Sequence, residues 1–186
     1  MQLLLSLLVL SAAFASQVRA NTTGSPNSLH ELATNFPPTA IVDPISIESI
    51  RNTLALYPFA IDGKNFDALS NVFSADAAAN YSAPLNVLSP LSDIKATLSA
   101  SLSCVTTQHQ FGTQLIDIDG PLEARSVTYF RAAHFGTTPE TEDQVLYTFG
   151  QYQDAWRRQA DASWRIVRRD LVYMGPRIGN QMVFLC

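Results

Sequence analysis

The residues of this chain best suited to proton transfer are two of its three histidines. His109 lies in the run Thr107-Gln108-His109-Gln110-Phe111, and His134 lies near the end of the next alternating run. Alternation of this kind predicts strands, and two histidines on neighbouring strands can face one cavity. Imidazole titrates near neutral pH, so such a pair can accept and return a proton. The spacing alone also fits two structural histidines, each satisfied by a backbone carbonyl.

Asp62 is the carboxylate that we expect beside these histidines. It ends a predicted helix where the chain turns back at Gly63, and a carboxylate at that corner can orient a histidine or raise its pKa. A simple turn-forming aspartate fits the same position. Tyr57, Phe111 and Tyr152 are the residues that we expect to contact a bound molecule, the tyrosines through their hydroxyl groups. All three also fit an ordinary amphipathic core.

Other catalytic motifs are absent from the sequence. It contains no GxSxG, no Ser-His-Asp pattern, no phosphate-binding loop, and neither the CxxC nor the histidine spacing of a zinc site. We therefore expect no metal and no cofactor. Two cysteines remain, Cys104 and Cys186, and neither carries a motif that would make it a nucleophile. In an oxidising compartment they could pair, and we predict that they lie within disulfide range.

The N-terminus predicts export. Residues 1–20 have a short apolar run and end in Val18-Arg19-Ala20, which fits the cleavage site of a secretory signal peptide. A membrane anchor is the alternative, but the run is shorter than the roughly 20 residues that a bilayer needs. Residues 21–43, rich in Asn, Ser, Thr and Pro, predict an arm or linker. We expect a protein that is secreted or resides in the lumen of the secretory pathway. Asn21 and Asn80 stand in glycosylation sequons, which also arise by chance.

The charge of the chain argues against nucleic acid as a partner. Lysine and arginine number 12 against 16 aspartates and glutamates, whereas nucleic-acid binding needs a basic face. One cluster could provide such a face: Arg157, Arg158, Arg165, Arg168 and Arg169. Its strand-like pattern indicates a solvated sheet face instead. We predict that Asp154, Arg157 and residues 165–169 form structural ion pairs there, each contributing about 1 kcal/mol or less. We also expect no membrane partner after processing.

The periodicity of the chain predicts helices first and a meander of strands afterwards. Three helices are predicted, at residues 44–61, 66–73 and 90–103. Pro58 should kink or break the first of them. Four long strands are predicted, at residues 105–117, 124–135, 145–158 and 164–173, with a shorter one at 78–83. This order indicates an α+β fold in which about three helices pack on one face of a strongly bent antiparallel sheet.

Four short motifs also stand in a recognisable order. They are Ile61-Asp62-Gly63-Lys64-Asn65-Phe66-Asp67-Ala68-Leu69, Thr107-Gln108-His109, Arg131-Ala132-Ala133-His134 and Tyr152-Gln153-Asp154. With them, the chain from about residue 45 to 173 resembles the SnoaL-like group of the NTF2-like superfamily, which includes scytalone dehydratase and polyketide cyclases. The resemblance implies a cone with an internal apolar cavity, in a domain at residues 44–175 followed by a tail at 176–186.

The resemblance further implies that Asp62, His109 and His134 form a general acid–base set. The expected reaction is a cofactor-independent dehydration, isomerisation or ring closure of a polyketide- or terpenoid-like small molecule. A secreted protein that binds an apolar small molecule and does no chemistry is the alternative. A third hypothesis is an interaction module whose cavity is filled by Phe111, Phe130, Phe135 and Phe149. The expected partner is a small molecule, and the sequence is also compatible with a homo-oligomer.

Overall fold

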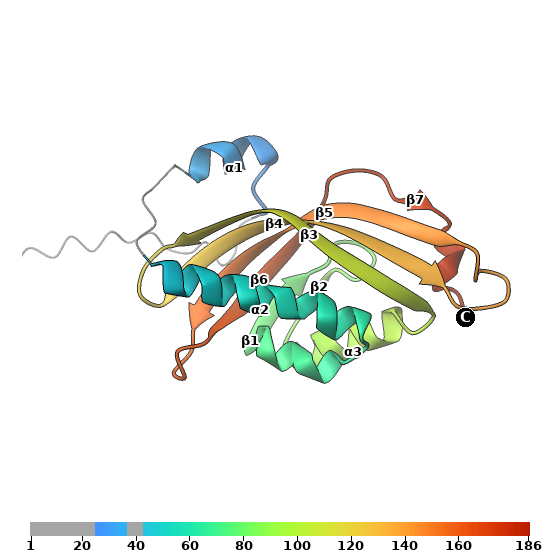
Figure 1. Cartoon of the computed structure of the whole chain (residues 1–186), viewed down its shortest axis with the longest axis horizontal. Helices are drawn as coiled ribbons and strands as arrows, with labels where there is room; N and C mark the ends of the chain where they lie inside the picture. The colour runs from blue at the N-terminus through green and yellow to red at the C-terminus, as the bar shows by residue number, and fades with distance from the viewer. Residues whose placement is uncertain (1–24, 37–42) are drawn as a thin grey trace, which may run out of the picture.

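The computed structural model describes residues 25–36 and 43–186 of the chain (Figure 1). The predicted signal peptide and the sequon at Asn21 lie outside the described residues. The described part is a mixed α+β fold with a curled seven-stranded sheet. Helices α2 and α3 lie on one face of this sheet, and the short helix α1 lies on the other (Figure 1). None of the described helices is long and apolar enough to cross a membrane.

The helices begin where the sequence provides caps. Helix α1, Leu29–Asn35, starts at Ser28 with a complete capping box. Helix α2, Pro44–Asp62, starts at Asp43, whose carboxylate accepts a hydrogen bond from the backbone of Ser46 at 2.9 Å. The predicted break at Pro58 is wrong, because α2 runs through it without interruption. The turns around Pro58 are held by tertiary packing, since Tyr57 and Ile61 are buried.

The next predicted helix is shorter than expected. A 3-10 helix, η1, covers Phe66–Asn71, and strand β1 then runs over Phe73–Asn80 instead of beginning at residue 78. Phe73 belongs to the strand because it is buried and lies opposite Ile166 in the sheet. Asn80 ends this strand with its side chain hydrogen-bonded to Asp170. Helix α3 covers Leu91–Ser101, close to the predicted range.

The antiparallel meander of four long strands is confirmed. Its strands are β3 Val105–Ile118, β4 Glu123–Gly136, β5 Val145–Arg158 and β6 Trp164–Tyr173. The full order is β2-β1-β6-β5-β4-β3, where β2 is Val87–Leu88. Strand β1 pairs with β6 in parallel, so the sheet is mixed at that edge. A short strand, β7, Ile178–Gly179, pairs with β5.

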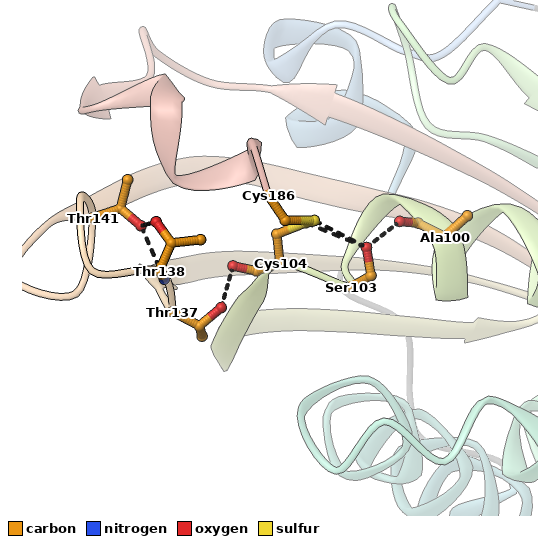
Figure 2. Close-up of a disulfide and its surroundings, with 7 residues drawn as sticks. All are labelled: Ala100, Ser103, Cys104, Thr137, Thr138, Thr141 and Cys186. Carbon is orange, nitrogen blue, oxygen red and sulfur yellow. Dashed lines mark hydrogen bonds between the residues drawn. A yellow bond between two sulfur atoms is a disulfide. The ribbon is translucent and has the colours of Figure 1, made fainter.

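The C-terminal segment packs back onto the sheet. After β7, a 3-10 helix, η2, covers Gln181–Phe184, with Val183 fully buried. A disulfide joins Cys186 to Cys104 at the start of β3, with 5.4 Å between their Cα atoms (Figure 2). The prediction that these cysteines lie within disulfide range is therefore confirmed. The residues expected to form a tail are anchored to the domain.

The charged residues of the closing hairpin are not all on a solvated face. Arg157 does form an exposed pair with Asp76. Asp154 and Arg169, however, are fully buried and joined by two hydrogen bonds of 2.8 Å, so the prediction of an exposed pair is wrong for them. The reason is a bulge at Val167. In the pairing of β5 with β6, Trp156 lies opposite Ile166 and Ala155 lies opposite Arg168, so Val167 is the extra residue. The extra residue shifts the alternation of β6 and turns Arg169 inward.

Candidate active site

The two histidines predicted from the sequence do converge. In the ladder of β3 and β4, His109 lies opposite Ala132 and His134 lies opposite Thr107. The two histidines are therefore diagonal neighbours on the same face of the sheet. Their ring centroids are 6.2 Å apart, and both side chains line the same cavity. The prediction that they share an internal cavity is confirmed.

Asp62 holds His109 in place from the last residue of α2. Its carboxylate accepts three hydrogen bonds, from the Thr107 hydroxyl at 2.8 Å, the His109 backbone N–H at 2.8 Å and His109 Nδ1 at 2.7 Å. Because an ionised carboxylate only accepts, Nδ1 of His109 carries the ring proton. In the neutral ring, Nε2 then has the lone pair that can accept a proton or a hydrogen bond. Asp62 does not line the cavity itself, whereas His109, which it holds, does.

The carboxylate of Asp62 stays ionised despite partial burial. Burial opposes its charge, but the hydrogen bonds from His109 and Thr107 outweigh burial and hold the pKa of Asp62 below its ordinary value. Lys64, two residues further on, has a buried ammonium nitrogen with no hydrogen-bond partner among the described residues. Burial lowers the pKa of Lys64, and the charge of Asp62 partly opposes this.

His134 lies in a different environment. It is only 8% exposed, and its Nδ1 lies 3.2 Å from the carbonyl oxygen of Leu146, which can only accept a hydrogen bond. Burial lowers the pKa of His134 to about 4. The hydrogen bond to Leu146 raises this pKa, whereas the nearby His109 and Lys64 lower it further. At neutral pH His134 is therefore a neutral imidazole whose Nδ1 carries the proton. It can accept a hydrogen bond at Nε2 but has no proton to give from that atom.

The cavity has a volume of about 380 Å³ and a mostly apolar wall. Its lining residues are Tyr57, Ile61, Tyr81, Pro84, Leu85, Leu98, Ser101, Leu102, His109, Phe130, Ala132, His134, Leu146, Thr148, Tyr152, Leu171, Tyr173, Arg177, Gln181 and Phe184. Tyr57 and Tyr152 are thus placed as expected. Phe111 does not line the cavity; its ring packs edge-on against Tyr152, with 6.0 Å between centroids. Phe111 therefore supports the wall from behind.

Aromatic and charged groups build the wall around the tyrosines. The hydroxyls of Tyr57 and Tyr81 lie 3.2 Å apart. Burial raises the pKa of Tyr81 and of Tyr152 well above the ordinary value, so both keep their hydroxyl protons. The guanidinium carbon of Arg169 lies 4.0 Å from the ring centroid of Tyr152 and 4.4 Å from that of Tyr57. Asp154 pairs with this guanidinium on the same inner face of the sheet.

Three contributors to the site are not predicted from the sequence. Tyr81 follows β1 directly and lies within the strand predicted at residues 78–83, where its aromatic ring is a signal that could have identified it. Phe184, whose ring centroid lies 5.1 Å from that of His134, has no periodic pattern around it. Arg169 is expected on the opposite face of the sheet, because the bulge in β6 leaves no clear sequence signal.

Taken together, the fold and the cavity define an NTF2-like α+β protein with an internal site. The chain belongs to the SnoaL-like family, because the model of the SnoaL-like domain matches residues 45–170. A protein of Mycobacterium tuberculosis strain H37Rv, named only as uncharacterised, is 32% identical over 121 residues, which cover 64% of this chain and 80% of the relative.

Solved structures show the same fold. The Kfla4162 protein of Kribbella flavida superposes with a TM-score of 0.66 at 22% identity, over 75% of this chain and 95% of that one. A protein of Novosphingobium aromaticivorans, provisionally described as a scytalone dehydratase, gives a TM-score of 0.64 at 23% identity, over 72% of this chain and 87% of that one. At these identities the similarity establishes the fold alone.

Proposed function

We propose that this protein is a cofactor-independent lyase or isomerase, of the dehydratase or cyclase type, that acts on a polyketide- or terpenoid-like small molecule. The observation that carries the proposal is the Asp62–His109 pair, which ends at an apolar cavity of about 380 Å³. A base fixed by a carboxylate at the wall of an apolar pocket is the arrangement that general acid–base catalysis requires.

His109 acts as the base in this proposal. Its Nε2 removes a proton from a carbon next to a substrate carbonyl, while Asp62 accepts the Nδ1–H bond and stabilises the imidazolium that forms. The imidazolium then returns the proton to a hydroxyl group on the neighbouring carbon. That hydroxyl leaves as water, and the substrate keeps a new double bond conjugated with its carbonyl. The atoms balance without an external reductant or oxidant.

The remaining polar groups of the cavity position the substrate oxygens. The Tyr57 and Tyr81 hydroxyls can donate to the carbonyl oxygen on which negative charge develops. Neutral His134 can accept a hydrogen bond from the hydroxyl that leaves. We therefore assign the proton transfers to His109 and a substrate-orienting role to His134.

Export belongs to the proposal as well. The predicted signal peptide supports a secreted protein or one of the secretory-pathway lumen, and the disulfide between Cys104 and Cys186 supports an oxidising compartment. Comparing the N-terminus and cell fraction of the native protein tests this. An unprocessed N-terminus in a reducing compartment would contradict it.

The test of the reaction uses bicyclic ketones that carry a hydroxyl group on the carbon next but one to the carbonyl. Formation of the conjugated product is followed by absorbance, and loss of one water by mass spectrometry. We expect His109→Ala to lower the rate by about 100- to 10,000-fold. His30→Ala, which removes an exposed histidine of α1, is the matched control and should keep full activity. A His109→Ala variant that folds and retains the wild-type rate would refute the proposed role. A comparison of metabolites with and without the gene identifies the natural substrate.

A binder without chemistry is the second candidate, and the apolar wall of the cavity favours it. It predicts that a ligand binds tightly and is recovered chemically unchanged from both the wild type and His109→Ala. The third hypothesis, a filled cavity, is wrong. Of the four phenylalanines expected to fill it, only Phe130 lines the cavity, and Phe135 is 38% exposed.

A further inference from the structure

One lining residue sets the cavity apart from a purely apolar pocket. Arg177 is the single lining residue with a permanent charge, and none of the lining residues in the described part of the chain is an aspartate, glutamate or lysine. Its positive charge is therefore not neutralised within the wall. A cavity that presents an unneutralised cation favours an anion as its occupant.

The guanidinium of Arg177 is held in place without a carboxylate. One of its nitrogens, Nη2, donates to the carbonyl oxygen of Ala83 at 3.2 Å, and the guanidinium carbon lies 5.3 Å from the ring centroid of Tyr173. Other arginines, such as Arg157 and Arg169, pair with aspartates. Arg177 makes no ion pair with any described residue. A guanidinium has five N–H donors, so most of its donors are available to a ligand.

Exposure places this charge at the mouth of the cavity. Arg177, Gln181 and Pro84 are exposed lining residues, whereas His134, Tyr57 and Tyr152 are buried ones. A molecule that reaches the histidines therefore passes an apolar wall and ends beside Arg177. Gln181 adds an amide that can also donate to an oxygen.

We propose that the ligand of this cavity is an amphipathic organic acid, with an apolar ring body inside and a carboxylate bound by Arg177 at the mouth. Because it concerns the same cavity, this assignment rests on the proposed function and names its substrate class. The carboxylate would lie at the end of the molecule away from the carbon that His109 deprotonates. A guanidinium binds a carboxylate through two parallel hydrogen bonds, which fixes orientation as well as charge.

The test measures binding instead of turnover, so that it is independent of the catalytic assignment. The neutral fluorescent probe N-phenyl-naphthylamine is displaced at neutral pH by naphthoic acid or by its methyl ester, which has the same ring system without the charge. We expect Arg177→Gln to weaken the acid by about 5- to 10-fold and to change the ester by less than about 2-fold, since a charge-assisted hydrogen bond at an exposed site contributes modestly. Added salt should weaken the acid alone.

Two variants keep the result interpretable. Arg131→Gln removes an exposed arginine of β4 that bonds Gln110 and does not line the cavity, and it should leave both ligands unaffected. His109→Ala should lower turnover by about 100- to 10,000-fold yet keep the preference for the acid, which separates failure of the proposed reaction from failure of this assignment. If Arg177→Gln weakens the acid and the ester equally, Arg177 only shapes the mouth, and the proposal is overturned. It is equally overturned if Arg177→Gln changes the affinity for neither ligand.

Discussion

Two aspartates of this chain each hold a basic side chain of the sheet, but their surroundings differ. Asp62 binds His109, which lines the cavity, whereas Asp154 binds Arg169 where both side chains are 0% exposed. Histidine can lose and regain a proton near neutral pH, and a guanidinium cannot. In the proposed reaction the first pair exchanges protons with a ligand, whereas the second keeps its charges fixed beneath the tyrosines.

Replacing Asp62 by asparagine gives the largest effect expected from this comparison. Asp62→Asn keeps the size of the side chain but removes the charge that stabilises the His109 imidazolium. We expect the rate of the proposed reaction to fall by about 100-fold or more, while the free energy of unfolding falls by only about 1–2 kcal/mol. Steady-state kinetics and urea unfolding measure the two quantities on one preparation.

Replacing Asp154 of the buried pair by asparagine should lower the free energy of unfolding far more than Asp62→Asn does. Asp154→Asn leaves the guanidinium of Arg169 buried without a counter-charge. Burial opposes the charge of Arg169, and at present the charge and hydrogen bonds of Asp154 outweigh that and hold the pKa of the guanidinium above its ordinary value. Breaking such a pair costs about 3–5 kcal/mol of stability. Calorimetry or urea unfolding checks the value.

A double variant distinguishes lost charge balance from lost packing. Asp154→Leu combined with Arg169→Met removes both charges and keeps much of the volume. We expect it to be far more stable than Asp154→Asn alone, because no uncompensated charge remains. Equal instability of the two variants would mean that the geometry of the pair, and not its charge balance, stabilises the fold.

The difference between the pairs also explains what the sequence could predict. The alternation of β3 is regular from Val105 to Phe111, so the face of His109 follows from the pattern. The sequence allows His134, on the neighbouring strand, to face the same cavity. Asp62 is predicted near the sheet because a helix end and a turn meet there. The face of His109 depends on local periodicity, whereas the place of Asp62 depends on a helix end, a turn and the family resemblance.

Arg169 and Phe184 could not be placed in that way. One bulge at Val167 reverses the face of every later residue of β6, and a bulge has no reliable signature in a single sequence. Phe184 reaches His134 because the disulfide and η2 return the C-terminal segment to the sheet. Both contacts depend on long-range packing, and the same holds for the continuity of α2 through Pro58.

The buried imidazole of His134 predicts a moderate dependence of stability on pH. Its folded pKa is lowered to about 4 from an ordinary 6.5, so between these values the unfolded chain binds a proton that the folded chain does not. Stability must therefore fall as the pH falls through this range. We expect a loss of about 2 kcal/mol between pH 7 and pH 5.

His134→Gln provides the control for that measurement, because glutamine does not titrate. The loss of stability between the two pH values should be smaller in the variant by about the same 2 kcal/mol. Asp62 does not interfere between pH 7 and pH 5. Its pKa is lowered in the folded protein, so its contribution to stability is lost only below about pH 4, as the pH falls through that folded pKa. Identical pH profiles of the wild type and His134→Gln would show that His134 is not buried as a neutral ring.

The exposed pair of Arg157 and Asp76 gives the smallest expected effect and tests whether burial is what separates the two classes of ion pair. Its nitrogen–oxygen distance of 2.7 Å is as short as the contact between Asp62 and His109, but the side chains are 46% and 65% exposed. Water and salt screen a pair of this kind, so Arg157→Gln should lower the free energy of unfolding by about 1 kcal/mol or less. Raising the salt concentration should reduce even that difference, whereas the buried pair of Asp154 and Arg169 should respond little because it lies beyond the reach of ions. If Arg157→Gln instead destabilises the fold as much as Asp154→Asn, then distance and not burial governs the stability of these ion pairs, and burial does not explain the large effect expected for Asp154→Asn.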